Sequence, residues 1–137
     1  MTEIQSVLGF DFGTQRIGVA AGQTVTGTAS PVTILSARQG IPDWQQVKKL
    51  IDEWRPSQLV VGLPLNMDGS ESDISQQARQ FADQLAKLSQ LPTTTIDERL
   101  SSIAAEQLLD PRKKVHVDGL AAMIIVETWL SQRSPFN

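Results

Sequence analysis

The N-terminal part of the chain alternates short apolar runs with polar turns. Residues 7–12, except Asp11, and residues 17–21 form two apolar runs, and residues 13–16 separate them as a polar turn. Two apolar runs joined by so short a polar link predict a β-hairpin. Residues 27–35 are rich in β-branched side chains and predict a third strand, in which Pro31 marks an edge or a bulge. We therefore expect three antiparallel strands in succession.

Helical spacing begins after these strands. Asp43 is of a type that caps helices, Gln46 stands three residues later, and Pro56 ends the pattern. The sequence therefore predicts a first helix between these points. Its apolar positions are Trp44, Val47, Leu50, Ile51 and Trp54. Trp44 and Trp54 are expected to be core residues, not a platform for stacked bases.

A continuous apolar run at residues 58–62 predicts a strand that is buried on both faces. Residues 63–70 follow as a loop rich in turn-forming residues. A second helix is then expected, and it should end before Pro92. Its apolar stripe consists of Ile74, Ala78, Phe81, Ala82, Leu85 and Leu88.

The last third of the chain adds a strand and two helices. Residues 93–97 predict the strand, and helical spacing recurs at residues 101–109. A basic connector at residues 111–116 leads to a closing helix over about 118–132. Three antiparallel strands followed by alternating helices and strands predict an α/β fold with a mixed sheet flanked by helices. We expect residues 1–137 to form a single domain.

Composition narrows the chemistry. The chain has 137 residues, no cysteine and one histidine, which excludes disulfide frameworks, iron–sulfur clusters, thiol nucleophiles and multi-histidine metal sites. Any catalysis must therefore rest on carboxylates, hydroxyls, Lys and Arg. The net charge of −3 argues against a generally basic nucleic-acid binder but leaves room for a local basic patch.

Two further patterns concern location. The longest strongly apolar stretch, residues 120–126, is followed by Glu127 and falls well short of the roughly 20 residues that a membrane span needs. The first six residues lack the basic and apolar regions of a secretory signal. We therefore expect a cytoplasmic protein without a membrane-spanning helix.

Acidic residues stand at three places where elements begin or end. Asp11 closes the first apolar strand, Asp97 and Glu98 follow the last strand, and Asp118 begins the closing helix. Taken singly, each acidic residue has a simpler structural explanation. Asp11 could cap the turn that follows it, and Glu98 could form a solvated ion pair with Arg99. Asp118 could cap the closing helix.

The three acidic places could also converge at one edge of the sheet. Converging carboxylates repel one another unless divalent cations neutralise them. Two-metal phosphodiester hydrolysis requires such a cluster, and ligands that are all oxygen favour Mg²⁺ or Mn²⁺. The pair of alanines at 121–122 would let the closing helix approach the sheet.

Four segments together resemble the YqgF family, also called RuvX. They are residues 11–20 (DFGTQRIGVA), 61–69 (VGLPLNMDG), 97–101 (DERLS) and 117–122 (VDGLAA), and they follow the family's order over nearly the whole chain. The resemblance implies an RNase H-like fold and a nuclease, associated with maturation of the 5′ end of pre-16S ribosomal RNA. For some members it implies resolution of Holliday junctions in DNA.

The resemblance also implies a catalytic set that binds two Mg²⁺ or Mn²⁺ ions. The set comprises Asp11, an acidic residue of the pair Asp97 and Glu98, and Asp118. Within the pair we favour Glu98.

Several residues are candidates for contact with nucleic acid. Arg16 and Arg99 either meet the scissile phosphate or neutralise neighbouring carboxylates. Asn66 lies in a loop that follows a buried strand, where sheet proteins place ligands. The basic connector is shorter than in many family members, and its three cations contact phosphates or form a solvated turn. These three cations are Arg112, Lys113 and Lys114.

Two other functions remain open at this point. Residues 11–14 also resemble the first phosphate loop of the actin and sugar-kinase superfamily, whose members close two such domains around a nucleotide, whereas this chain supplies one. The chain could instead be a non-catalytic nucleic-acid-binding module. The sequence does not choose between RNA and branched DNA as the substrate, and cleavage of a symmetric junction would imply a homodimer with twofold symmetry.

Overall fold

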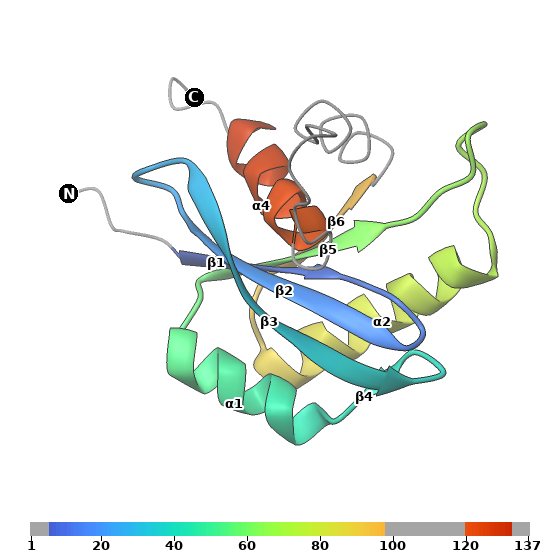
Figure 1. The fold of residues 1–137 in the computed structure, drawn as a ribbon, viewed down its shortest axis with the longest axis horizontal. Coiled ribbons are helices and arrows are strands. Elements are labelled where there is room, and N and C mark those ends of the chain that lie inside the picture. Colours follow the sequence, from blue (N-terminus) through green and yellow to red (C-terminus); the bar gives the residue numbers. More distant parts are fainter. Residues whose placement is uncertain (1–5, 98–119, 133–137) are drawn as a thin grey trace, which may run out of the picture.

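A computed structural model describes residues 6–97 and 120–132 (Figure 1). Six strands form one mixed sheet in the order β4-β3-β2-β1-β5-β6. Antiparallel pairing joins the first four strands of the chain, and β5 and β6 run parallel to β1. The strands are β1 (Ser6–Asp11), β2 (Arg16–Gln23), β3 (Thr28–Arg38), β4 (Ile41–Pro42), β5 (Gln58–Leu63) and β6 (Thr93–Asp97).

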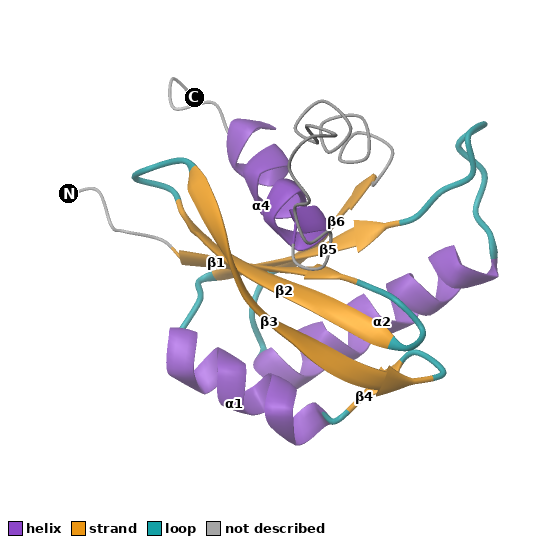
Figure 2. Ribbon diagram, viewed as in Figure 1, coloured by secondary structure: helices purple, strands orange, loops and turns teal. Residues whose placement is uncertain are grey.

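Helices cover both faces of this sheet (Figure 2). Helices α1 (Trp44–Trp54) and α2 (Asp73–Ser89) pack on one face, and α4 (Leu120–Gln132) packs on the other. Asp43 caps α1 through its side chain, which accepts a hydrogen bond from the Gln45 backbone at 3.0 Å. The described part of the chain contains no helix long and apolar enough to cross a membrane.

The central strand β1 divides the core into two clusters. Leu8 and Phe10 belong to the cluster beneath α1 and α2, and so does Phe12 just after the strand. Val7 belongs to the cluster beneath α4. Because successive side chains of a strand point to opposite faces, Gly9 and Asp11 share the α4 face with Val7. The alternation therefore directs the one carboxylate of β1 toward the layer that α4 occupies.

Helix α4 approaches β1 closely because Gly9 has no side chain. A Cβ at Gly9 would stand 2.2 Å from Cγ2 of Val126 and 3.4 Å from the carbonyl oxygen of Ala122. Ala122 is fully buried, as the expected close approach of the alanine pair requires. Gly22 on β2 makes a similar approach, since its Cβ would stand 2.5 Å from Cγ1 of Val126. Small residues on both sides thus set the distance between α4 and the sheet.

The predicted strands and the first two helices are confirmed. Pro31 lies beside a register shift, because Val19 pairs with Thr33 whereas Ala20 pairs with Pro31, so the expected bulge is present. The short strand β4 was not predicted, since two residues carry no periodicity. The helix expected at 101–109 and the connector at 111–116 lie outside the described residues, and the single-domain organisation stays a prediction.

Two positions expected in the core are more exposed than predicted. Trp54 is 42% exposed and Leu88 is 39% exposed, whereas Trp44 packs partly buried against the core. Both exposed residues lie in the last turn of their helix, where the chain turns away toward the next strand. Helical spacing identified the correct face but could not tell how far the sheet extends beneath it.

We predict that Gly9→Ala destabilises the protein by about 1–3 kcal/mol, because the new methyl group overpacks the contact with Val126. Val126→Ala should relieve this clash, so the double variant should lose less stability than the two single variants added together. Urea unfolding of all four proteins measures this coupling. Strict additivity would show that α4 does not rest on Gly9.

Candidate functional site

The candidate site lies at the end of the sheet where β1 finishes. Asp11 is the last residue of β1 and is partly buried, and it stands opposite Gly18 of β2 in the sheet register. Its neighbouring strand on the other side is β5, which is parallel to β1. Asp11 therefore occupies the centre of the sheet edge, on the face covered by α4. This is the position that the sequence predicted for a ligand carboxylate.

The turn after Asp11 is tight and tied to the next strands. A Cβ at Gly13 would stand 2.4 Å from the carbonyl oxygen of Arg16, so the turn requires glycine there. The backbone N–H of Ala37 donates to the Gln15 oxygen at 2.8 Å, and that of Gly40 donates to the Thr14 oxygen at 2.9 Å. These bonds hold the turn rigidly beside Asp11.

Helix α4 points its N-terminal end toward Asp11. Leu130, near the C-terminal end of α4, approaches Gly22, which pairs with Val7 at the start of β1. Ala122, in the first turn of α4, approaches Gly9 in the middle of β1. Helix α4 therefore runs antiparallel to β1, with its N-terminal end toward Asp11 and its C-terminal end toward the start of β1.

Asp97 is the last residue of β6. Asp97 pairs with Leu63, which belongs to the cluster beneath α1 and α2, whereas Ile96 belongs to the cluster beneath α4. Strand alternation thus places Asp97 on the sheet face opposite Asp11. The other member of the pair, Glu98, lies outside the described residues.

Asn66 lies in the loop between β5 and α2, which extends away from the sheet (Figure 1). The Asn66 side chain donates to the Ser70 hydroxyl at 3.0 Å, and the Ser70 backbone N–H donates to Asp68 at 2.9 Å. A bridge between Leu65 and Glu71 closes the base of this loop. Asn66 is exposed, so its described bonds give the loop its shape without burying the residue.

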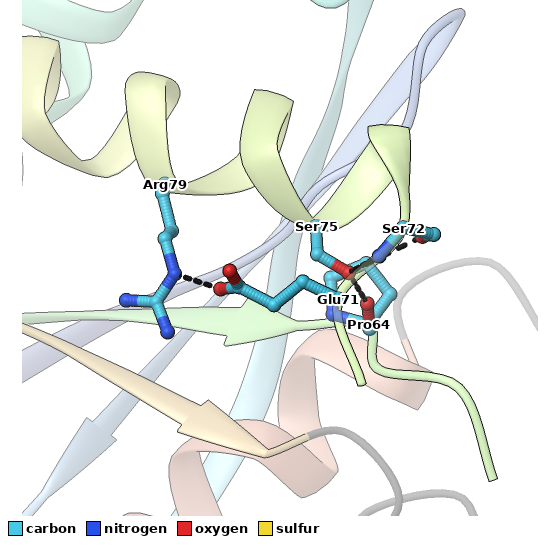
Figure 3. A network of polar contacts seen from close by, with 5 residues as sticks. All are labelled: Pro64, Glu71, Ser72, Ser75 and Arg79. Atoms are coloured by element: carbon cyan, nitrogen blue, oxygen red, sulfur yellow. Dashed lines mark hydrogen bonds and ion pairs between the residues drawn. The ribbon is translucent and has the colours of Figure 1, made fainter. Parts of the chain in front are cut away.

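Ser75 anchors the same loop to the first turn of α2 (Figure 3). Its buried hydroxyl donates to the Pro64 carbonyl oxygen and accepts from the Ser72 backbone N–H at 3.0 Å. Glu71 and Arg79 add an exposed ion pair across the helix start. Sequence reasoning missed Ser75, because the reciprocal cap of Ser72 uses a serine where the usual capping signature has Glu or Gln.

The remaining candidates divide into one that is placed and others that are not. Arg16 is exposed at the start of β2, and the turn between β1 and β2 separates it from Asp11. No group of three His, Cys, Asp or Glu side chains suited to a metal ion occurs within residues 6–97 and 120–132. The candidates outside the described residues are Glu98, Arg99, Arg112, Lys113, Lys114 and Asp118.

Comparison with known proteins decides the family. Residues 5–132 match the family described as "RuvX: Holliday junction resolvase". The chain belongs to the RuvX family. A relative from Sodalis glossinidius, named "Putative pre-16S rRNA nuclease", is 48% identical over 138 residues that cover 96% of this chain and 98% of the relative. A Coxiella burnetii relative of the same name is 49% identical and covers 92% of each chain.

Solved structures confirm the fold of this RuvX member. The RuvC of T. thermophilus in complex with a Holliday junction substrate has a TM-score of 0.58 at 13% identity, over 94% of this chain and 95% of that one. The fowlpox virus Holliday junction resolvase has a TM-score of 0.51 at 11% identity, over 93% and 99%. The comparisons thus confirm the predicted family, the RNase H-like fold class and the nuclease class of enzyme.

We predict that Ser75→Ala lowers the free energy of unfolding by about 1–3 kcal/mol, because it leaves the Pro64 carbonyl and the Ser72 N–H without their buried partner. Ser131→Ala is the matched control, since its exposed hydroxyl donates to the Thr128 carbonyl oxygen of the same helix at 2.8 Å, and its loss should change stability by less than about 0.5 kcal/mol. Denaturant unfolding of both variants checks this. Equal stabilities would contradict an anchoring role for Ser75.

Proposed function

We propose that this RuvX member is a divalent-cation-dependent endonuclease that processes the 5′ end of pre-16S ribosomal RNA. The observation that carries the proposal is the meeting of β1 and α4 at one edge. Asp11 closes β1 at this edge, and the contact of Ala122 with Gly9 directs the start of α4 toward it. The names of the relatives from Sodalis glossinidius and Coxiella burnetii support the RNA substrate. This substrate also favours a cytoplasmic location.

Asp11, Glu98 and Asp118 would hold the cations. Asp118 stands two residues before Leu120, where α4 begins, and so precedes the helix end that faces Asp11. Asp97, which precedes Glu98 in the sequence, occupies a position in β6 that belongs to the sheet face opposite Asp11. This supports the choice of Glu98 over Asp97.

The donor chemistry of this set fits Mg²⁺ or Mn²⁺. All three side chains offer only carboxylate oxygens, which such hard cations prefer. When bound, a pair of such cations activates water and stabilises the leaving oxygen in phosphodiester hydrolysis. The chain's own part is to hold the carboxylates in place. The glycine turn after Asp11 and the packing of α4 on Gly9 supply that rigidity.

The phosphate backbone is proposed to contact polar and positively charged side chains around the sheet edge at Asp11. Arg16 is exposed at the start of β2, close to Asp11 in the sheet, and this position supports its proposed contact with a phosphate beside the site. Asn66, in the adjoining loop, is exposed and held by its bond to Ser70. Arg99 and the connector cations Arg112, Lys113 and Lys114 are proposed to extend this surface.

A four-way DNA junction is the second candidate substrate. The match to two junction resolvases over more than nine-tenths of the chain favours this alternative. Symmetric cleavage of a junction needs two active sites, so this activity would require a homodimer. An RNA leader carries no such symmetry and can be cut by one subunit.

We expect Asp11→Asn to lower cleavage of a labelled pre-16S leader RNA by about a hundredfold or more, since the cations supply several kcal/mol of stabilisation to the transition state. EDTA should abolish wild-type cleavage, and Mg²⁺ or Mn²⁺ should restore it. Asp52→Asn removes an equivalent charge from the exposed surface of α1 and should cut like the wild type. A labelled four-way junction, assayed in parallel, distinguishes the two substrates.

Cleavage that survives both EDTA and Asp11→Asn in a folded protein would contradict the proposal. Retained nucleic-acid binding without cleavage in either cation would favour a binding module instead.

We predict further that Glu98→Gln loses cleavage as severely as Asp11→Asn, whereas Asp97→Asn retains at least about a tenth of it, because Asp97 belongs to the opposite face. Cleavage rates at saturating Mg²⁺, with circular dichroism to verify folding, test this pair. The reverse ranking would assign Asp97 as the ligand.

A further inference from the structure

A small pocket lies next to the candidate site on the sheet face that α1 and α2 cover. Its volume is about 270 Å³, and Phe12, Gly40 and Trp44 contribute to its lining. Phe12 follows Asp11 directly, so their Cα atoms are about 3.8 Å apart. Their side chains belong to opposite faces of the sheet. The pocket and the carboxylate therefore lie on either side of the same edge.

The lining combines amides with aromatic rings, and none of its side chains is charged. Each glutamine amide offers two donors and one acceptor. Trp44 stacks on Phe81 with ring centres 5.5 Å apart and 22° between the planes, and Phe12 lies 5.5 Å from the same ring. Such a lining suits an uncharged planar ligand with a hydrogen-bonding edge better than an anion. The glutamines are Gln39, Gln77, Gln80 and Gln84.

Gln77 contributes a hydrogen-bond acceptor to this pocket that lacks a donor within the described residues. Its Oε1 atom is buried, and it has no hydrogen-bond partner within the described residues. The same atom lies 3.2 Å from the place where a Cβ of residue 40 would stand, so the glycine leaves space beside it. A buried carbonyl oxygen without a donor is costly. A ligand N–H in the pocket would satisfy this oxygen once the Gln77 side chain turns toward it.

We propose that this pocket binds one unpaired nucleobase of the nucleic-acid substrate, with Gln77 accepting a hydrogen bond from the edge of the base. This rests on the proposed nuclease function, because it takes the ligand from the strand that crosses the Asp11 edge. Single-stranded RNA is recognised through splayed bases that contact aromatic rings and pair with side chains. The volume lies below the roughly 300 Å³ of pockets for drug-sized ligands and suits a single base.

The test measures binding of a fluorescently labelled 12-nucleotide single-stranded RNA to the full-length protein in EDTA, where the proposed function predicts no cleavage. Gln77→Met removes the amide but keeps the length of the side chain. It should weaken RNA binding about fivefold or more, the loss expected for one buried hydrogen bond. The stability of the free protein should stay equal or rise, because a buried unpaired oxygen has been removed.

Gln76→Met is the matched control. Gln76 precedes Gln77 on α2 but is exposed and does not line the pocket, so this variant should bind RNA like the wild type. Equal affinities of Gln77→Met and wild type would overturn the proposal. So would equal losses in the two variants, since these would reflect the surface of α2 and not the pocket.

A second measurement places an abasic nucleotide at each position of the RNA in turn. One position should lose about fivefold in affinity for the wild type and little for Gln77→Met. Equal losses for both proteins at every position would contradict base binding by Gln77. Because this cycle is measured without cleavage, it can succeed where the Asp11 experiment fails, and it can fail while cleavage stands.

Discussion

The close contact between α4 and the centre of the sheet is the constraint on which the site depends. Gly9 and Gly22 have no side chains, and Val126 fills the space that their Cβ atoms would need. The helix can therefore lie directly on β1 and β2, with Ala122 against the backbone of β1. A bulkier residue at Gly9 would lift the helix and move its first turn away from Asp11. Interior packing density makes such a contact intolerant of small changes in volume.

The contact between α4 and the sheet also sets which groups surround the sheet edge at Asp11. Strand alternation directs Asp11 to the α4 face, and the tight turn at Gly13 holds it there. On the opposite face, Phe12 and α2 enclose an uncharged pocket next to the same edge. One short segment of the chain therefore serves two faces, with a carboxylate proposed for cation binding on one and an amide-lined pocket proposed for a base on the other.

Much of this arrangement is predictable from the sequence, because periodicity encodes the direction of side chains. The apolar runs of the strands and the helical spacing in α1 and α2 predicted these elements, whereas the division of the core into two clusters appears only in the structure. The four motifs predicted the family and, through it, the nuclease class. The role of Gly9 was not predictable, because a glycine in a strand does not reveal which residue approaches it. The buried Oε1 atom of Gln77 was equally hidden, since it lies beside Gly40, which is distant in sequence.

The most direct test of the central claim locates the cation. Mn²⁺ added to the isotope-labelled protein broadens NMR signals of nuclei close to the bound ion. We predict selective broadening of the backbone amides of Phe12, Gly13 and Gly62, while those of Gln23 and Thr28, at the opposite end of the sheet, stay sharp. Broadening centred anywhere other than the Asp11 edge, or uniform broadening of all exposed amides, would contradict the account.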